Sequence, residues 1–372
     1  MIETPPVEAL RRRSGRKWAG VPADVLPAWI ADMDFLPAAA ITRTLEEAVR
    51  LGDFGYGPTA KASGLAEAFS AWAERRWSWQ VDPADMMPMP DVVGGIANCI
   101  EALTDPGDAI LVQTPAYPPL LGSVRVAGRT LIEQAIDRGP IDFDALDAAL
   151  GRHKVRMLLF CHPHNPLGRV FAADELRAVA ALAERHDLVI VSDEVHADLT
   201  FPGRPHLPFA SFAPERTVTL NAPSKAFNVA GLRTAICVAP PGLRARLAAL
   251  PPTRWSAFST LGVRAALAAW SDEGAAWLDT CLVHLLAMRD RVGERLPSSI
   301  GYEPPDASYL AWLDCRALGL DDPAEFFLDR AGVQLSPGSD FGAAGVGHVR
   351  LNFATSAEIL DEMLERMARA LA

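Results

Sequence analysis

The most constraining feature of this 372-residue sequence is a series of short apolar runs that alternate with amphipathic stretches. Val155–Cys161 is almost continuously apolar, and so is Leu188–Val191. Between them, Asp174–His186 carries apolar residues every three or four positions, which is typical of a helix with one buried face. Near-continuous apolar strands that alternate with helices predict an α/β fold, in which helices cover both faces of a parallel sheet.

Other segments extend this pattern over most of the chain. Apolar runs predict further strands at 86–89, 108–112, 218–220 and 234–239, and two helices at 41–51 and 64–77. The glycine pair in 91–95 predicts a loop, followed by a helix over 96–103. After residue 255 the chain becomes mostly helical, with strands expected at 307–313 and 348–353 and a last helix at 356–371. We therefore expect a large domain over 41–280 and a smaller α+β domain formed by 1–40 and 281–372.

Composition narrows the classes of function. The formal net charge of −11 argues against nucleic acid as a partner. The five cysteines are scattered and never spaced as C-x-x-C, which predicts reduced, mostly buried thiols and no zinc or other metal site. The N-terminus lacks the apolar core of a signal peptide, and no apolar run reaches the roughly 18 residues of a membrane span. We expect a cytoplasmic protein without membrane contact, and a solvated basic cluster at Arg11, Arg12, Arg13, Arg16 and Lys17.

Three polar residues come directly after successive predicted strands: Asn165, Asp193 and Lys225. Alone, each has a simpler explanation as a turn residue, a helix cap or a solvated charge. Together they lie at the carboxyl edge of the sheet, where α/β folds bind ligands. A carboxylate, an amide donor and a lysine amine are the groups that a pyridine-aldehyde cofactor needs for its ring nitrogen, ring oxygen and aldehyde.

Other residues complete a candidate cofactor site. Val93 and Gly94 precede a predicted helix, and their backbone N–H groups are placed to bind a phosphate with Arg233 as its cation. Tyr117 follows a strand and is placed to stack on a ring, although a lone Tyr is more often simply half-buried. Arg350 lies on a strand of the second domain and is suited to a bidentate carboxylate contact, with an edge-strand salt bridge as the alternative.

These motifs resemble fold-type I pyridoxal-phosphate enzymes of the class I/II aminotransferase group, and more narrowly the MalY/PatB-like cystathionine β-lyase (C–S lyase) branch. The resemblance implies a mostly parallel seven-stranded sheet flanked by helices, plus a smaller α+β domain. The segments that carry it occur in the expected order over nearly the whole chain: Trp29–Phe35, Phe54–Gly57, Asn165–Gly168, Asp193–His196, Ala222–Asn228, Gly231–Arg233, Tyr309–Asp314 and Arg350–Asn352.

The resemblance also implies a role for each matching residue. Lys225, Asp193 and Tyr117 would be catalytic: Lys225 carries pyridoxal 5′-phosphate and acts as the base, Asp193 pairs with the ring nitrogen, and Tyr117 stacks on the ring. Asn165 and His196 would lie near the ring oxygen. The phosphate would be bound by Val93, Gly94, Ser224, Arg233 and Tyr56, with Tyr56 reaching the site of a partner in a homodimer. The substrate would contact Arg350, Tyr56 and Trp29.

Three positions depart from the family pattern. His196 stands where many aminotransferases carry Tyr, Ala222 where many relatives have a phosphate-binding Ser or Thr, and His162 where Asn is common. The expected reaction is β-elimination from L-cystathionine or another S-substituted L-cysteine, which gives a thiol, pyruvate and ammonia. The same residues also suit an aminotransferase, or a non-catalytic regulatory protein on the same fold, and the residue chemistry alone does not separate these alternatives.

Overall fold

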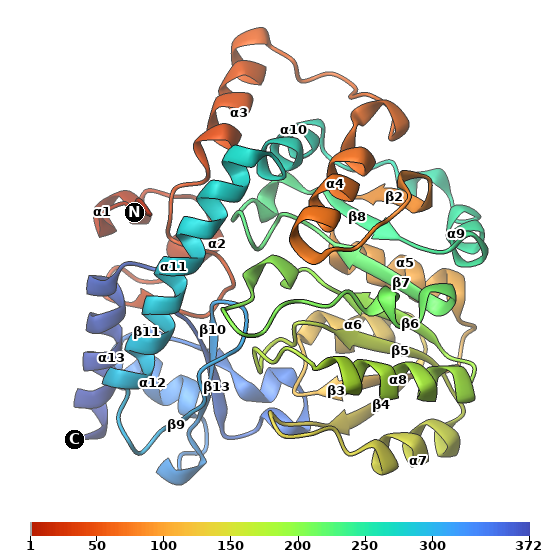
Figure 1. The fold of residues 1–372 in the computed structure, drawn as a ribbon. Coiled ribbons are helices and arrows are strands. Elements are labelled where there is room, and N and C mark those ends of the chain that lie inside the picture. Colours follow the sequence, from red (N-terminus) through yellow and green to blue (C-terminus); the bar gives the residue numbers. More distant parts are fainter. Residues whose placement is uncertain (1) are drawn as a thin grey trace.

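A computed structural model describes residues 2–372 and contains a central seven-stranded sheet (Figure 1). The strand order is β2-β8-β7-β6-β5-β3-β4, and only β8 runs antiparallel to its neighbours. This confirms the predicted mostly parallel, seven-stranded sheet. The strands are β2 (Met86–Met89), β3 (Ala109–Thr114), β4 (Thr130–Ala135), β5 (Val155–Cys161), β6 (Val189–Asp193), β7 (Thr217–Asn221) and β8 (Ala235–Val238).

Helices cover both faces of this sheet, which explains the continuous apolar runs. In β5, Met157 and Leu159 pack on one face and Leu158 and Phe160 on the other, because successive side chains of a strand point in opposite directions. One face is covered by α5 (Val92–Leu103), α6 (Pro118–Val126) and α9 (Pro241–Ala248), and the other by α7 (Phe143–His153) and α8 (Ala173–Arg185).

The C-terminal part of the chain forms a second, antiparallel sheet that packs beside the N-terminal segment (Figure 1). Its strand order is β12-β13-β10-β9, and a separate parallel pair joins β1 to β11. The bounds are β1 (Leu26–Pro27), β9 (Gly301–Tyr302), β10 (Leu310–Asp314), β11 (Val333–Gln334), β12 (Ser336–Pro337), β13 (His348–Asn352), α12 (Pro323–Ala331) and α13 (Ala357–Leu371). The pairing of both chain ends accords with the expected small domain, whose exact division stays a prediction.

The remaining helices are α1 (Val7–Arg11), α2 (Arg16–Ala19), α3 (Ala39–Leu51), α4 (Leu65–Trp77), α10 (Thr260–Ala269) and α11 (Asp272–Arg295). The expected boundary between 280 and 281 falls inside α11. The predicted loop at 91–95 is wrong from Val92 onward, because the Asp91 side chain caps α5 by accepting the Gly94 N–H at 2.8 Å. The five cysteines are free and buried, as predicted.

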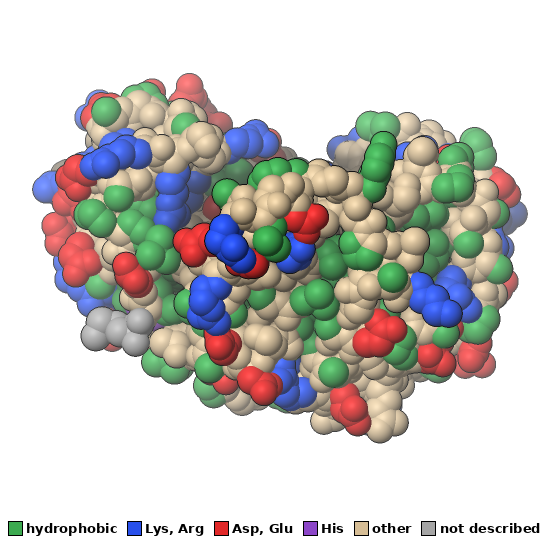
Figure 2. Space-filling view, turned by 90° about the horizontal axis from the view of Figure 1, so that it is seen from above, with side chains coloured by type: hydrophobic (Ala, Val, Ile, Leu, Met, Phe, Trp, Pro, Cys, Tyr) green, Lys and Arg blue, Asp and Glu red, His purple; other side chains and the backbone are tan. Residues whose placement is uncertain are grey.

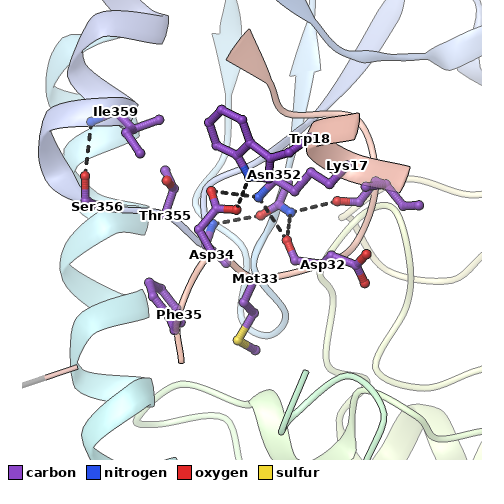
Figure 3. Close-up of polar contacts among 12 residues, drawn as sticks. Lys17, Trp18, Asp32, Met33, Asp34, Phe35, Asn352, Thr355, Ser356 and Ile359 are labelled. Carbon is purple, nitrogen blue, oxygen red and sulfur yellow. Dashed lines mark hydrogen bonds and ion pairs between the residues drawn. The ribbon is translucent and has the colours of Figure 1, made fainter. Parts of the chain in front are cut away.

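The predicted solvated basic cluster is only partly correct. Arg12 and Arg16 are exposed, but Lys17 is buried and forms a 3.0 Å ion pair with Asp34 (Figure 3). The molecular face in Figure 2 has acidic and basic side chains interspersed. Within residues 2–372, no helix is long and apolar enough to cross a membrane, and no three His, Cys, Asp or Glu side chains form a potential metal site.

Candidate active site

The polar residues at or just after the ends of β5, β6 and β7 meet in one pocket of about 180 Å³. This placement follows from the topology, because neighbouring parallel strands end at the same edge of the sheet. Most of the predicted site residues line the pocket: Val93, Tyr117, Asn165, Asp193, His196, Ser224, Lys225 and Arg233. Asp91 and the Ala31 segment also line it and were not assigned from the sequence.

Lys225 is held at the pocket by backbone rather than by a carboxylate. Its Nζ donates a 2.9 Å hydrogen bond to the carbonyl of Ala31, which also accepts from the Tyr309 hydroxyl at 3.0 Å. Burial lowers the pKa of Lys225, and the nearby Arg350 acts in the same direction, while Asp32 and Asp193 oppose it. A lowered pKa favours the neutral amine, which is the form that attacks an aldehyde or accepts a proton.

The residues around Ala31 are held in place by β13 and by the helix α2, and this fixes the position of the Ala31 carbonyl (Figure 3). Asn352 on β13 donates from Nδ2 to the carbonyls of Ile30 and Asp32, at 2.7 and 2.6 Å. Asp34 accepts from Trp18 Nε1 at 2.6 Å and pairs with Lys17. These buried contacts anchor the segment on both sides of Ala31, so they position the Lys225 amine indirectly.

Asp193 ends β6 and is a buried carboxylate with few partners. It is 4% exposed and accepts one hydrogen bond, from the backbone N–H of Val195 at 3.2 Å. Burial raises the pKa of Asp193 to about 6, although the Val195 hydrogen bond and Lys225 act against the rise. A buried carboxylate with spare acceptor capacity in a pocket is suited to a cationic N–H partner.

Arg350 on β13 contacts Asn165, which lies in the loop after β5. Arg350 Nη1 donates to Asn165 Oδ1 at 3.1 Å, which leaves the Asn165 amide nitrogen as a donor. Arg350 Nη2 donates to the Trp29 carbonyl at 2.9 Å and to Ser336 Oγ at 3.2 Å, and the guanidinium lies 4.9 Å from the Phe341 ring. Its Nε is buried without a partner, so Arg350 retains a donor for an additional anion.

Two of the donors predicted for a phosphate, Gly94 and Arg233, meet at the first turn of α5. Arg233 Nη2 donates to Asp91 Oδ2, and the Gly94 N–H donates to Asp91 Oδ1. Gly94 therefore lies inside the helix and its N–H is already bound, which differs from the open glycine loop expected from the sequence. A helix N-terminus with a nearby guanidinium is still a favourable place for an anion, but here it already holds the carboxylate of Asp91.

The comparisons with known proteins agree with this architecture. Residues 31–367 match the family model of class I and II aminotransferases. The chain belongs to this family. The cystathionine β-lyase of Corynebacterium glutamicum is 35% identical over 99% of each chain, and the cystathionine β-lyase PatB of Bacillus subtilis is 35% identical over 94% of this chain and 93% of its own. Cystalysin from Treponema denticola, solved with pyridoxal 5′-phosphate, superposes with a TM-score of 0.93 at 29% identity, over 100% of this chain and 99% of its own.

Three further residues predicted from the resemblance, Tyr56, Trp29 and His196, differ in how close they lie to the pocket. Tyr56 is 110% exposed in the segment between α3 and α4 and does not line the pocket of its own chain. Trp29 contacts Arg350 through its carbonyl, and its ring lies beneath Arg16. His196 lines the pocket, where burial, assisted by Lys225 and Arg350, lowers its pKa to about 3 and keeps the ring neutral.

A buried polar network centres on Glu194, inside the Asp193–His196 segment. The Glu194 side chain accepts from His206 Nε2 and Ser192 Oγ, both at 2.8 Å, and from the Phe209 N–H at 2.9 Å. The His206 ring lies 4.8 Å from the ring of His162. His162, one of the three residues noted above as departures from the family pattern, therefore packs against this network near the Asn165 loop. Ala222, the other departure near Lys225, is buried in the core beside α5.

Proposed function

We propose that this chain is a carbon–sulfur β-lyase that uses pyridoxal 5′-phosphate to cleave L-cystathionine or related S-substituted L-cysteines. The observation that carries the proposal is the 35% identity to the Corynebacterium glutamicum cystathionine β-lyase over 99% of both chains. The pocket supports the cofactor in this proposal, because Lys225, Asp193 and Asn165 are the residue types that pyridoxal 5′-phosphate needs at one sheet edge. The products are a thiol, pyruvate and ammonia.

The residues of the pocket fit the cofactor. Asp193 has spare acceptor capacity and a pKa raised by burial, so a protonated ring nitrogen would both satisfy and stabilise its charged form. Asn165 would offer its amide nitrogen to the ring oxygen, and Tyr117 would offer its ring for stacking. Lys225 would hold the aldehyde carbon until the substrate amine displaces it, which leaves the lysine amine free. Val93, Gly94, Ser224 and Arg233 would bind the phosphate. When bound, the cofactor supplies a ring that accepts the electrons released at the substrate α-carbon.

The protein side chains perform the remaining steps. Arg350 binds the substrate α-carboxylate through its unpaired Nε and its Nη groups, and its stacking on Phe341 fixes the orientation of the guanidinium. Lys225 removes the proton from the α-carbon, and its lowered pKa favours the neutral amine that this step requires. The β-carbon–sulfur bond then breaks, and the sulfur leaves with the electron pair and is protonated by Lys225 or by water. The released 2-aminoacrylate hydrolyses to pyruvate and ammonia.

Pyruvate release from L-cystathionine in the absence of any oxo acid tests this proposal. The holoenzyme should form pyruvate, ammonia and homocysteine in equal amounts. Strict dependence on an added oxo acid would instead identify an aminotransferase, the activity named in the matching family model. Binding of the cofactor without turnover of either kind would favour the regulatory alternative.

The proposed assembly is a homodimer in the cytoplasm. The segment between α3 and α4 exposes Phe54 and Tyr56, at 62% and 110%, and exposed aromatic side chains of this kind are common in subunit interfaces. Five buried, free cysteines are compatible with a reducing compartment. Light scattering of the holoenzyme should give twice the chain mass. Mixed dimers of Tyr56→Ala and Lys225→Ala chains test whether Tyr56 serves the other subunit, because only a shared site would then restore one intact active site.

A further inference from the structure

Trp29 lies between two arginines, Arg350 and Arg16, and Arg350 also contacts the pocket residue Asn165. Its carbonyl accepts the hydrogen bond from Arg350 Nη2 at 2.9 Å. Its ring lies beneath the guanidinium of Arg16, with 5.6 Å between Arg16 Cζ and the ring centroid. The arginine assigned to the substrate α-carboxylate is therefore linked, through a single residue, to a second guanidinium from the N-terminal segment.

Arg16 differs from its neighbour in the same short helix. Lys17 is buried and paired with Asp34, and Figure 3 shows Lys17 and Trp18 pointing toward that carboxylate. Arg16 is exposed, and its guanidinium has no ion pair and no hydrogen bond to any part of the described chain, residues 2–372. Stacking on Trp29 uses the face of the guanidinium and leaves its in-plane N–H groups available to an anion.

The charge of Arg16 also acts on the pocket itself. Burial raises the pKa of Tyr117, which lines the pocket, and the positive charges of Arg350 and Arg16 oppose that rise. Within the described residues, Arg350 is engaged by Asn165, Trp29 and Ser336, and its unpaired donor is assigned to the α-carboxylate. Arg16, in contrast, has no polar partner among the described residues, and it is therefore available for the other end of a substrate.

We propose that Arg16 binds an anionic group on the far side of the substrate sulfur, so that the site selects thioethers with a distal carboxylate over neutral thioethers. The inference rests on the proposed C–S lyase function, because the group that Arg16 would bind belongs to the part of the substrate that leaves with the sulfur. A planar guanidinium held against an indole is suited to this task, since it can offer two parallel donors to a carboxylate with little loss of side-chain freedom.

A charge comparison with a matched control tests the proposal. The holoenzyme and its R16Q and R12Q variants are assayed with S-(2-carboxyethyl)-L-cysteine and with S-butyl-L-cysteine, a neutral thioether of similar length. R16Q should raise KM for the anionic substrate roughly three- to tenfold, with kcat nearly unchanged and the neutral substrate unaffected. R12Q removes an exposed charge of the same cluster and should change neither substrate. An equal loss on both substrates, or no change in their ratio, would overturn the proposal.

A binding experiment separates this inference from the proposed lyase activity. Calorimetric titration of the same holoenzymes with L-2-aminoadipate and its neutral counterpart L-norleucine makes the charge comparison without C–S cleavage. R16Q should weaken only aminoadipate binding, R16K should retain part of it, and added salt should reduce the wild-type preference. If the lyase assay fails but this preference depends on Arg16, the binding role stands alone. If R16Q leaves the preference intact, the role of Arg16 is refuted whatever the reaction.

Discussion

Arg233 and Asp91 form an ion pair in the pocket, and Arg233 is one of the residues that we propose bind the cofactor phosphate. The same carboxylate accepts the N–H of Gly94, so two of the donors expected to bind the phosphate already bind an internal anion. A phosphate carries more negative charge than a carboxylate and would have to share these donors with Asp91 or displace it. Asp91 therefore stabilises the cofactor-free chain and opposes phosphate binding through charge repulsion.

We predict that Asp91→Asn tightens binding of pyridoxal 5′-phosphate roughly three- to tenfold. Asn is as good a helix cap as Asp, so α5 keeps its cap while the negative charge is removed. The measurement is a titration of cofactor-free protein, followed by cofactor absorbance. Asp142→Asn is the matched control, because Asp142 caps α7 through the Ala145 N–H and does not line the pocket. Weaker binding in Asp91→Asn would mean that Asp91 instead orients Arg233 for the phosphate.

Asp193→Asn should stabilise the cofactor-free protein at neutral pH while it impairs the enzyme. The carboxyl pKa rises from 3.8 to about 6 on folding, mainly through burial. The wild type therefore keeps its full stability below about pH 4 and loses up to about 3 kcal/mol as the pH rises through about 6. Asn does not ionise and avoids this loss.

Urea unfolding of both cofactor-free proteins between pH 4 and pH 8 measures this difference. The two free energies of unfolding should diverge up to about pH 6.5 and then stay parallel. A constant difference across the whole range would show that Asp193 does not titrate as its burial requires. The holoenzyme of Asp193→Asn should lose most of its activity, because the ring nitrogen loses its charged partner.

The strands that carry the site could be predicted from sequence because they are buried on both faces. Val155–Cys161 was located to the residue, and β6 and β7 were found within one or two positions. The strand β4 was missed since it lies at the edge of the sheet, where most of its side chains, such as Glu133, have access to solvent. A strand covered on only one side lacks the continuous apolar run that made the others visible.

The site was predictable only where the topology alone places a side chain. Asn165, Asp193 and Lys225 follow adjacent strands, so their convergence needs no knowledge of packing. The Ala31 carbonyl that holds Lys225 could not be predicted in this way, because its position depends on distant contacts such as that between Asn352 and Asp32. The role of Asp91 could not be predicted for a different reason. The nearby glycine pair indicates a loop, whereas the Asp91 side chain caps the helix α5 by accepting the Gly94 N–H.

Glu194→Ala should destabilise the fold by about 3–5 kcal/mol, because it leaves a buried hydrogen-bonding network unsatisfied. Glu194 and His206 both have fully buried side chains, and the carboxylate also binds Ser192 and the Phe209 N–H. Chemical denaturation of the holoenzyme is the measurement. Glu101→Ala is the control, since the Glu101–Arg254 pair is about half exposed and should contribute less than about 1 kcal/mol. Equal effects of the two substitutions would exclude a special role for the buried pair.

Reduction with borohydride should attach the cofactor to Lys225 and to no other lysine. The chain contains only four lysines, so peptide mapping by mass spectrometry gives an unambiguous assignment: Lys17, Lys61, Lys154 and Lys225. Lys225 is the lysine that lines the pocket, and burial lowers its pKa, which favours the reactive neutral amine.

Lys225→Ala should abolish the labelling and reduce pyruvate formation at least about a thousandfold, since the variant loses both the covalent anchor and the base. Lys154→Asn, at the exposed end of α7, should keep both properties. Labelling at Lys17, Lys61 or Lys154 in the wild type would contradict the assignment of the whole site.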